Sequence, residues 1–172
     1  MIDAHLRRWQ VQDADDLAAA LRADPELVRQ TGELGSAADH IRRTLLCDDT
    51  RVVRAVVLDG RVVGSVAVTA IEHRHGTGWT SYWLAPAARG LGLATRGLAT
   101  VAALAFAEGV VRLELGHRVN NPASCRVATA AGFAAEGIER ARLRYGAERF
   151  DVETHARLAT DPVPAVEPLP LR

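Results

Sequence analysis

The most constraining part of this 172-residue sequence is residues 79–105, where a strand, a glycine-containing loop and a helix follow one another directly. Residues 79–84 are mostly aromatic or β-branched, which favours a strand. The next eight residues contain Pro86, Gly90 and Gly92, which is typical of a turn. From Leu93 onward, apolar residues recur at helical spacing. The segment therefore predicts a strand that passes through a glycine loop into a helix.

The start of this helix is a candidate anion-binding site. The first turn of a helix has unpaired backbone N–H groups and the positive end of the helix dipole. Gly90 and Gly92 carry no side chain that would block an anion, and Arg89 and Arg96 add positive charge. Phosphate or pyrophosphate would suit such a site. An ordinary connection that needs glycine for its turn is the alternative, because the loop lacks both GxGxxG and, having no lysine, GxxxxGK[ST].

The rest of the sequence predicts an α+β domain. Asp59-Gly60 between two valine-rich runs indicates a hairpin, and Ser36 and Asn121 are good helix N-caps. The predicted element order β-α-α-β-β-β-α-β-α-β-β gives one mixed sheet of about seven strands with helices on both faces. We expect a single domain over residues 1–160. Residues 161–172 hold four of the seven prolines and predict a flexible tail.

Composition argues against several functional classes. The net charge is zero, with 21 basic residues, all arginine, and 21 acidic residues, so binding to nucleic acid or anionic membranes is not expected. No apolar run approaches the ~20 residues of a membrane span, and residues 1–12 do not look like a signal peptide. Cys47 and Cys125 fit neither a disulfide framework nor a metal spacing, which favours a cytoplasmic protein without metal. His73-x-His75 alone is poor support for a metal site.

Two blocks of sequence resemble a known family. Arg89-Gly90-Leu91-Gly92-Leu93-Ala94 is similar to the acetyl-CoA signature of the GCN5-related N-acetyltransferases (GNAT), Q/R-x-x-G-x-G/A. Residues 81–95 as a whole are similar to the branch that acetylates ribosomal-protein N-termini. The same branch has a second block resembling Asn121-Pro122-Ala123-Ser124, Val127, Gly132-Phe133 and Glu136-Gly137. Two blocks in the right order are more specific than either alone, and the resemblance covers residues 6–161.

The resemblance implies how acetyl-CoA would be held as co-substrate. In the family, the central strand parts from its neighbour, and the pantetheine arm pairs with the exposed backbone, here that of Tyr82, Trp83 and Leu84. The pyrophosphate would lie on backbone amides of the loop and the helix start, which are those of Arg89, Gly90, Leu91, Gly92, Leu93, Ala94 and Thr95. The signature fits in two registers, beginning at Ala87 or at Arg89. A side-chain role for Arg89 is therefore open, while the amide role is common to both registers.

The resemblance also implies direct acetyl transfer, without a covalent enzyme intermediate. Asn121 would hydrogen-bond the pantetheine arm, although capping a helix is an equal interpretation. Ser124 would protonate the leaving thiolate, and Tyr145 is the alternative donor. Glu114 is the candidate general base, but it could instead pair with an arginine. Other base candidates are Glu72, His73, His75 and His117, of which His117 lies nearest to Asn121 in the sequence.

The acceptor is not encoded in any motif. The family resemblance implies that the first two helices and the last hairpin form the acceptor pocket, and that the acceptor is a protein N-terminal α-amine. A small-molecule amine is the first alternative, because an acidic pocket could come from Asp13, Asp15, Asp16, Asp24 and Glu26, although these also suit a solvated helix face. A non-catalytic acetyl-CoA-binding module is the second. A homodimer is suggested by analogy alone.

Overall fold

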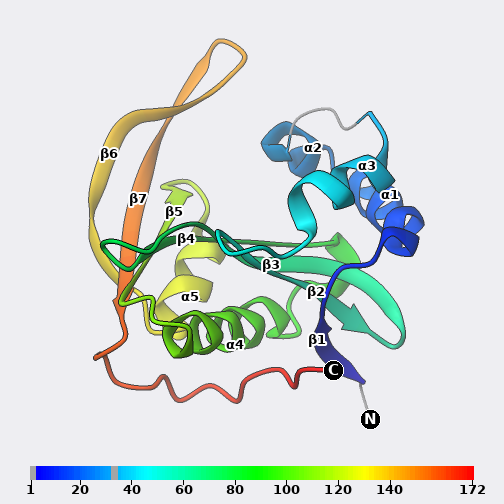
Figure 1. Cartoon of the computed structure of the whole chain (residues 1–172). Helices are drawn as coiled ribbons and strands as arrows, with labels where there is room; N and C mark the ends of the chain where they lie inside the picture. Colours follow the sequence, from blue (N-terminus) through cyan, green and yellow to red (C-terminus); the bar gives the residue numbers. More distant parts are fainter. Residues whose placement is uncertain (1–2, 32–34) are drawn as a thin grey trace.

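A seven-stranded sheet organises the chain. The computed structural model describes residues 3–31 and 35–172 (Figure 1). The strand order is β1-β2-β3-β4-β5-β7-β6, and all neighbours are antiparallel except β4 and β5, which are parallel. The α+β prediction with a mixed, mostly antiparallel sheet is confirmed. The strands are β1 Ala4–Arg7, β2 Val52–Leu58, β3 Arg61–Glu72, β4 Thr77–Leu84, β5 Arg112–Arg118, β6 Ala134–Tyr145 and β7 Glu148–Leu158.

Helices cover both faces of the sheet, as predicted. In Figure 1, α4 and α5 lie below the sheet, while α1, α2 and α3 lie above it. A core cluster with Leu98 and Leu113 fills the side of α4, and a second cluster with Trp9, Leu17 and Ile41 fills the side of α1 and α3. The helices are α1 Ala14–Ala23, α2 Pro25–Thr31, α3 Ala37–His40, α4 Leu93–Ala107 and α5 Pro122–Ala130, with short turns at Val11–Asp13, Ile41–Leu45 and Pro86–Ala88.

Local sequence signals account for several element boundaries. Asp59 and Gly60 both have left-handed backbone conformations, with φ of 48° and 81°, as the predicted tight hairpin requires. The Ser36 hydroxyl accepts a hydrogen bond from the Asp39 N–H, which confirms the predicted cap of α3. The sequence of the last hairpin predicts a strand from about residue 140, but β6 already begins at residue 134. Register shifts along its pairing with β7 let residues without strict alternation stay in the ladder.

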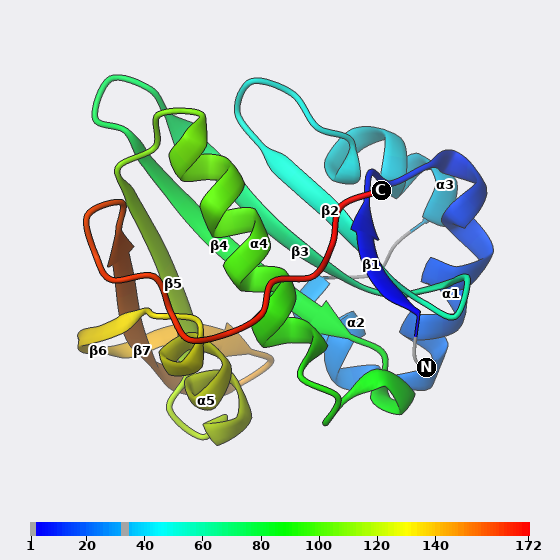
Figure 2. The ribbon, with the colours of Figure 1, turned by 90° about the horizontal axis from the view of Figure 1, so that it is seen from below.

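The predicted flexible tail, residues 161–172, is instead packed along α4 and ends beside β1 (Figure 2). The Leu6 N–H donates to the Pro170 carbonyl at 2.8 Å, and the Arg172 N–H donates to the Leu6 carbonyl at 2.9 Å. The Leu169 side chain is 1% exposed within the core on the side of α4. This burial and the backbone pairing offset the entropy of ordering the tail, and a high proline content does not reveal either contact.

Candidate active site

The two central strands part halfway along their length. β4 pairs with β5 only from Thr77 to Trp79, opposite Arg112 to Glu114. At the fork, the Thr80 hydroxyl donates a hydrogen bond to the Glu114 carbonyl at 2.8 Å. Beyond it, the C-terminal half of β4 has a ladder partner only on its β3 side among the described residues. The predicted splay is therefore present, and it leaves one backbone edge of β4 available to a ligand.

The glycine loop places the start of α4 next to this open edge. Gly90 and Gly92 have φ of 80° and 73°, a left-handed conformation that disfavours any side chain. Gly92 is the N-cap of α4, and no described side chain caps the helix. The first backbone N–H groups of α4 are thus offered to an anion at the positive end of a 15-residue helix.

The parted strands and the helix start enclose one cavity of about 650 Å³, a size typical of small-molecule sites. The second sequence block reaches the same cavity, because α5 forms its other side. Leu91 is the exception among the predicted cofactor residues: its side chain is 44% exposed on the loop and does not line the cavity. The predicted residues that line it are Tyr82, Trp83, Leu84, Arg89, Gly90, Gly92, Leu93, Ala94, Thr95, Asn121 and Ser124.

A small hydrogen-bond network connects α5 to β4. The Asn121 side chain accepts from the Ser124 N–H at 3.2 Å, which confirms its role as the cap of α5. Its amide nitrogen also donates to the Ser124 hydroxyl at 3.2 Å. The Tyr82 hydroxyl donates to the Ser124 carbonyl at 3.0 Å, and burial raises the pKa of Tyr82 above its ordinary value. The network fixes the Ser124 hydroxyl at the cavity wall.

Arg89 joins the glycine loop to the N-terminal helices. Its guanidinium forms an ion pair with Asp24, between α1 and α2, and donates to the Leu84 carbonyl at 3.0 Å. Burial raises the pKa of Asp24, but the hydrogen bond and charge of Arg89, together with backbone N–H groups of Glu26 and Leu27, outweigh it and hold this pKa below its usual value. The Arg89 side chain thus has a structural partner.

Arg118, which was not predicted, also lines the cavity. Its guanidinium donates to the Glu26 carboxylate of α2 at 2.8 Å. It also stacks over the rings of Tyr145 and Phe150, with its central carbon 5.5 and 5.1 Å from the ring centres. Arg118 therefore connects α2 to the β6–β7 hairpin. The feature of the sequence that could have indicated a role for Arg118 is its position, three residues before Asn121.

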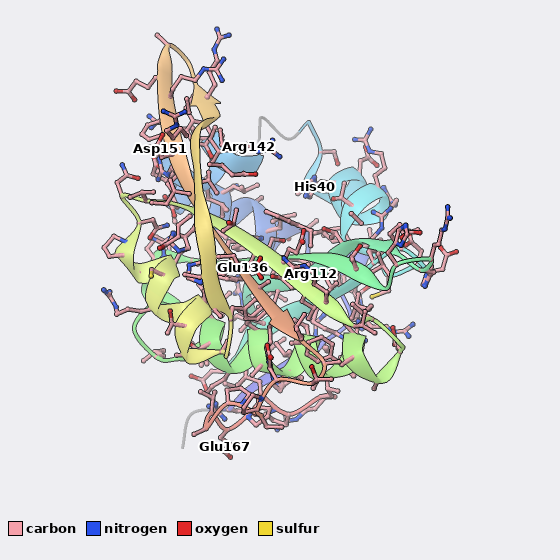
Figure 3. The ribbon with its side chains drawn as sticks, turned by 90° about the vertical axis from the view of Figure 1, so that its left-hand side faces the viewer. His40, Arg112, Glu136, Arg142, Asp151 and Glu167 are labelled. Carbon is pink, nitrogen blue, oxygen red and sulfur yellow. The ribbon has the colours of Figure 1, made fainter. Side chains whose placement is uncertain are left out.

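The predicted base and the alternative acid lie elsewhere. The Glu114 carboxylate pairs with Arg112 at 2.8 Å, and Arg112 also pairs with Glu136 at 2.5 Å (Figure 3). Neither Glu114 nor Tyr145 lines the cavity, so their catalytic roles remain predictions without a contact to support them. Glu72, His73 and His75 lie at the turn between β3 and β4, at the opposite end of β4 from Leu84. His117 is buried against His155.

Comparison with known proteins identifies the class. The family described as "Acetyltransferase (GNAT) domain" matches residues 4–134, so the chain belongs to the GNAT acetyltransferases, which use acetyl-CoA as co-substrate. A sequence search found no matching curated protein. Among the described residues, no helix is both long and apolar enough to cross a membrane.

Solved structures share the fold at low sequence identity. One is RimL, the ribosomal L7/L12 alpha-N-protein acetyltransferase in complex with coenzyme A, with a TM-score of 0.82, 19% identity, and coverage of 90% of this chain and 93% of that chain. RimJ of Mycobacterium smegmatis has a TM-score of 0.79 at 24% identity, covering 91% and 82%. The microcin C7 self-immunity acetyltransferase MccE has 0.81 at 16% identity, covering 91% and 92%. These likenesses establish the fold but not the acceptor.

Proposed function

We propose that this protein transfers the acetyl group of acetyl-CoA to the α-amino group of a protein N-terminus. The observation that carries the proposal is the cavity in which an unpaired strand edge meets an uncapped helix start. The β4 backbone from Tyr82 to Leu84 would pair with the amides of pantetheine. The first-turn amides of α4 would hold the pyrophosphate.

The residues at the cavity wall suit direct acyl transfer. The amine nitrogen attacks the thioester carbon, so that a C–N bond forms, the C–S bond breaks and the amine releases a proton to water. The Ser124 hydroxyl accepts from Asn121, which leaves its own proton available for the departing thiolate. The Tyr82 proton is directed to the Ser124 carbonyl, and its raised pKa keeps the phenol neutral. Holding the two reactants together supplies most of the rate.

The composition of the cavity wall favours an acceptor that needs little help to lose its proton. The acidic side chains among the lining residues, Asp24 and Glu26, are both paired with arginines. An α-amine has a pKa near 8 and is roughly one quarter deprotonated at pH 7.5, whereas a lysine amine is only about 0.1% deprotonated. A site without an unpaired base therefore suits an N-terminal α-amine.

The acidic residues of the N-terminal helices do not form a pocket for a polycation. Asp13 pairs with Arg7 at 2.7 Å and Asp16 pairs with Arg61 at 2.5 Å. Together with the pairs of Asp24 and Glu26, this neutralises four of the five acids that suggested a small cationic substrate. The structural similarity to RimL, a ribosomal L7/L12 alpha-N-protein acetyltransferase, adds support for a protein N-terminus.

The test is mass spectrometry of the protein incubated with acetyl-CoA and two substrate pools, with released thiol measured in parallel. One pool holds peptides with free N-termini, and the other holds polyamines, aminoglycosides and amino acid derivatives. Matched peptides with a blocked N-terminus and an internal lysine serve as control. We expect acetylation of α-amines only. Products confined to the amine pool would refute the acceptor, and acetyl-CoA binding without thiol release from any substrate would indicate a non-catalytic module.

A further inference from the structure

Four potential metal ligands converge where α5 packs on the sheet. His117 lies on β5, Glu153 and His155 lie on β7, and Cys125 lies on α5. His117 is directly opposite Glu153 in the antiparallel ladder, and His155 is two residues further along β7, so the three side chains share one face. The ligand atoms of all four residues lie within 4.8 Å of one another.

A backbone carbonyl lies close to the Nδ1 atom of each imidazole. The Nδ1 atom of His117 lies 3.0 Å from the carbonyl of Arg118, and that of His155 lies 3.4 Å from the carbonyl of Phe133. Because a carbonyl only accepts, both contacts place the proton on Nδ1. The two Nε2 atoms then face each other with lone pairs at 3.0 Å. With both rings neutral these lone pairs repel, so a proton or a metal ion between them would stabilise the arrangement.

The carboxylate of Glu153 lies close to the Nε2 atoms of both imidazoles. One of its oxygens lies 3.3 Å from Nε2 of His117 and 3.4 Å from Nε2 of His155. Nitrogen and oxygen ligands at the corners of a zinc tetrahedron, each about 2.0–2.2 Å from the ion, lie about 3.3–3.5 Å apart. The observed separations of 3.0, 3.3 and 3.4 Å are close to these tetrahedral edges.

We propose that His117, Cys125, Glu153 and His155 form a binding site for one divalent transition-metal ion, with Zn²⁺ the best match. Two imidazoles, a thiolate and a carboxylate are ligands that Zn²⁺ favours. The carbonyls of Arg118 and Phe133 act as outer partners that orient the two rings, as in established metal sites. Binding converts the thiol to a thiolate, so one proton leaves the protein for each ion bound.

The site has a structural consequence for the cavity. Cys125 directly follows Ser124 near the start of α5, a helix of nine residues. An ion bound to Cys125 on one side and to β5 and β7 on the other would hold this short helix against the sheet. This inference departs from the expectation of no metal, which rested on spacing along the chain. Residues 117, 125 and 153–155 match no metal motif and meet only through the fold. It does not depend on the proposed acceptor.

The test uses the full chain, freed of metal with a chelator and titrated with Co²⁺ as a spectroscopic probe, followed by Zn²⁺ competition. We expect one ion per chain by elemental mass spectrometry, visible bands of tetrahedral intensity, a thiolate-to-cobalt charge-transfer band, and displacement by Zn²⁺. Cys125→Ser should abolish the charge-transfer band and weaken affinity by more than about 100-fold, beyond the 10- to 100-fold typical of outer partners. His155→Ala should also weaken binding by at least this factor.

Matched controls are Cys47→Ser and His75→Ala. Cys47 is a half-buried cysteine that contacts the backbone of Val53 on β2, far along the sheet from the cluster, and should leave the spectrum unchanged. Equal binding by the Cys125 and Cys47 variants would overturn the proposal. So would a wild-type protein that binds no Co²⁺ or Zn²⁺ and keeps the same melting temperature with and without chelator, because a shared proton would then occupy the cluster. The wild-type spectrum decides even if a variant does not fold.

Discussion

The cavity has two walls that are built in different ways. The cofactor wall, which we propose holds acetyl-CoA, comes from residues 82–95 and presents mainly backbone groups, at the open edge of β4 and the start of α4. The acceptor wall, which we propose faces the acceptor, comes from residues far apart in the sequence and presents charged side chains, namely Asp24, Glu26 and Arg118. The cofactor wall is thus formed by backbone groups of one continuous segment. The acceptor wall is formed by side chains of residues that are distant in the sequence.

A cavity built in this way would let one fold keep its co-substrate while its acceptor changes. A backbone site is fixed by dihedral angles, such as the left-handed Gly90 and Gly92, and most substitutions elsewhere leave it intact. A side-chain site changes with a single substitution. RimL, RimJ and MccE share the fold with this chain at 16–24% identity. If the two walls are independent, variants should separate acetyl-CoA binding from acceptor binding.

The largest effect should come from placing a charge on the cofactor wall. Thr95 lines the cavity in the first turn of α4, so Thr95→Asp would put a carboxylate where the pyrophosphate is proposed to lie. Repulsion between like charges near a protein surface is worth about 4 kcal/mol at 4 Å. We expect the Kd of acetyl-CoA, measured by calorimetry, to rise at least about 100-fold.

The same change should not harm the helix, because an acidic residue in the first turn interacts favourably with the dipole. Thr95→Asn is the neutral control of equal shape and should change the Kd less than about threefold, while both variants melt near the wild-type temperature. Unchanged acetyl-CoA affinity in the folded Thr95→Asp protein would show that the pyrophosphate binds elsewhere.

A substitution at Ser124, which lines the cavity, tests the proposed protonation of the leaving thiolate. Ser124→Ala removes the proposed proton donor to the thiolate. Since a thiol has a pKa near 8.5, the thiolate leaves readily, and we expect kcat to fall only about 10- to 100-fold, at or below the low end for acid–base catalysis. Tyr145→Phe removes the alternative donor and should leave kcat unchanged. The opposite pattern, with only the Tyr145 variant impaired, would transfer the role to Tyr145.

The cofactor wall could be predicted from sequence because its information is local. The glycine loop, the α4 start, the Asn121 cap and the splayed strand were all inferred from short segments or their family resemblance. The conformations they require, positive φ and N-capping, depend on residues within one or two turns of each other. The direction of the Leu91 side chain could not be inferred from the sequence, because its exposure depends on how the loop packs beside the cavity.

The assembled parts could not be predicted, because their partners are distant in sequence. The Arg118–Glu26 pair joins residues 92 positions apart, and the Leu169 side chain of the supposed flexible tail finds its place beside α4. Glu114 was a reasonable base on the correct strand, but it lies opposite Trp79, where β4 and β5 are still paired, and its carboxylate pairs with Arg112 and does not line the cavity. Such contacts follow from strand register and packing, which local patterns do not specify.

A substitution at Arg118 should weaken binding of the acceptor and leave binding of acetyl-CoA unchanged. Arg118→Gln removes the charge that pairs with Glu26 and the stacking over Tyr145 and Phe150, which loosens the link between α2 and the β6–β7 hairpin. We expect the KM for the peptide acceptor to rise about 10-fold, since charged hydrogen bonds contribute about 1.5–3 kcal/mol, with the Kd of acetyl-CoA unchanged. Arg144→Gln, on the same hairpin, is the control. A parallel loss of acetyl-CoA affinity would show that the walls are coupled.

The smallest effect should come from the ion pair that joins the two walls. Asp24→Asn keeps the shape but removes the charge opposite Arg89, and we expect the free energy of unfolding at pH 7 to fall by about 1 kcal/mol. Because folding lowers the pKa of Asp24, its stabilisation is complete above the ordinary aspartate value near 3.9 and is lost as pH falls through the folded-state value. Urea unfolding from pH 7 to pH 3 should therefore show wild type and variant converging at the acid end. The exposed Asp15→Asn is the control, and a gap as wide at pH 3 as at pH 7 would show that packing, rather than charge, links the glycine loop to the N-terminal helices.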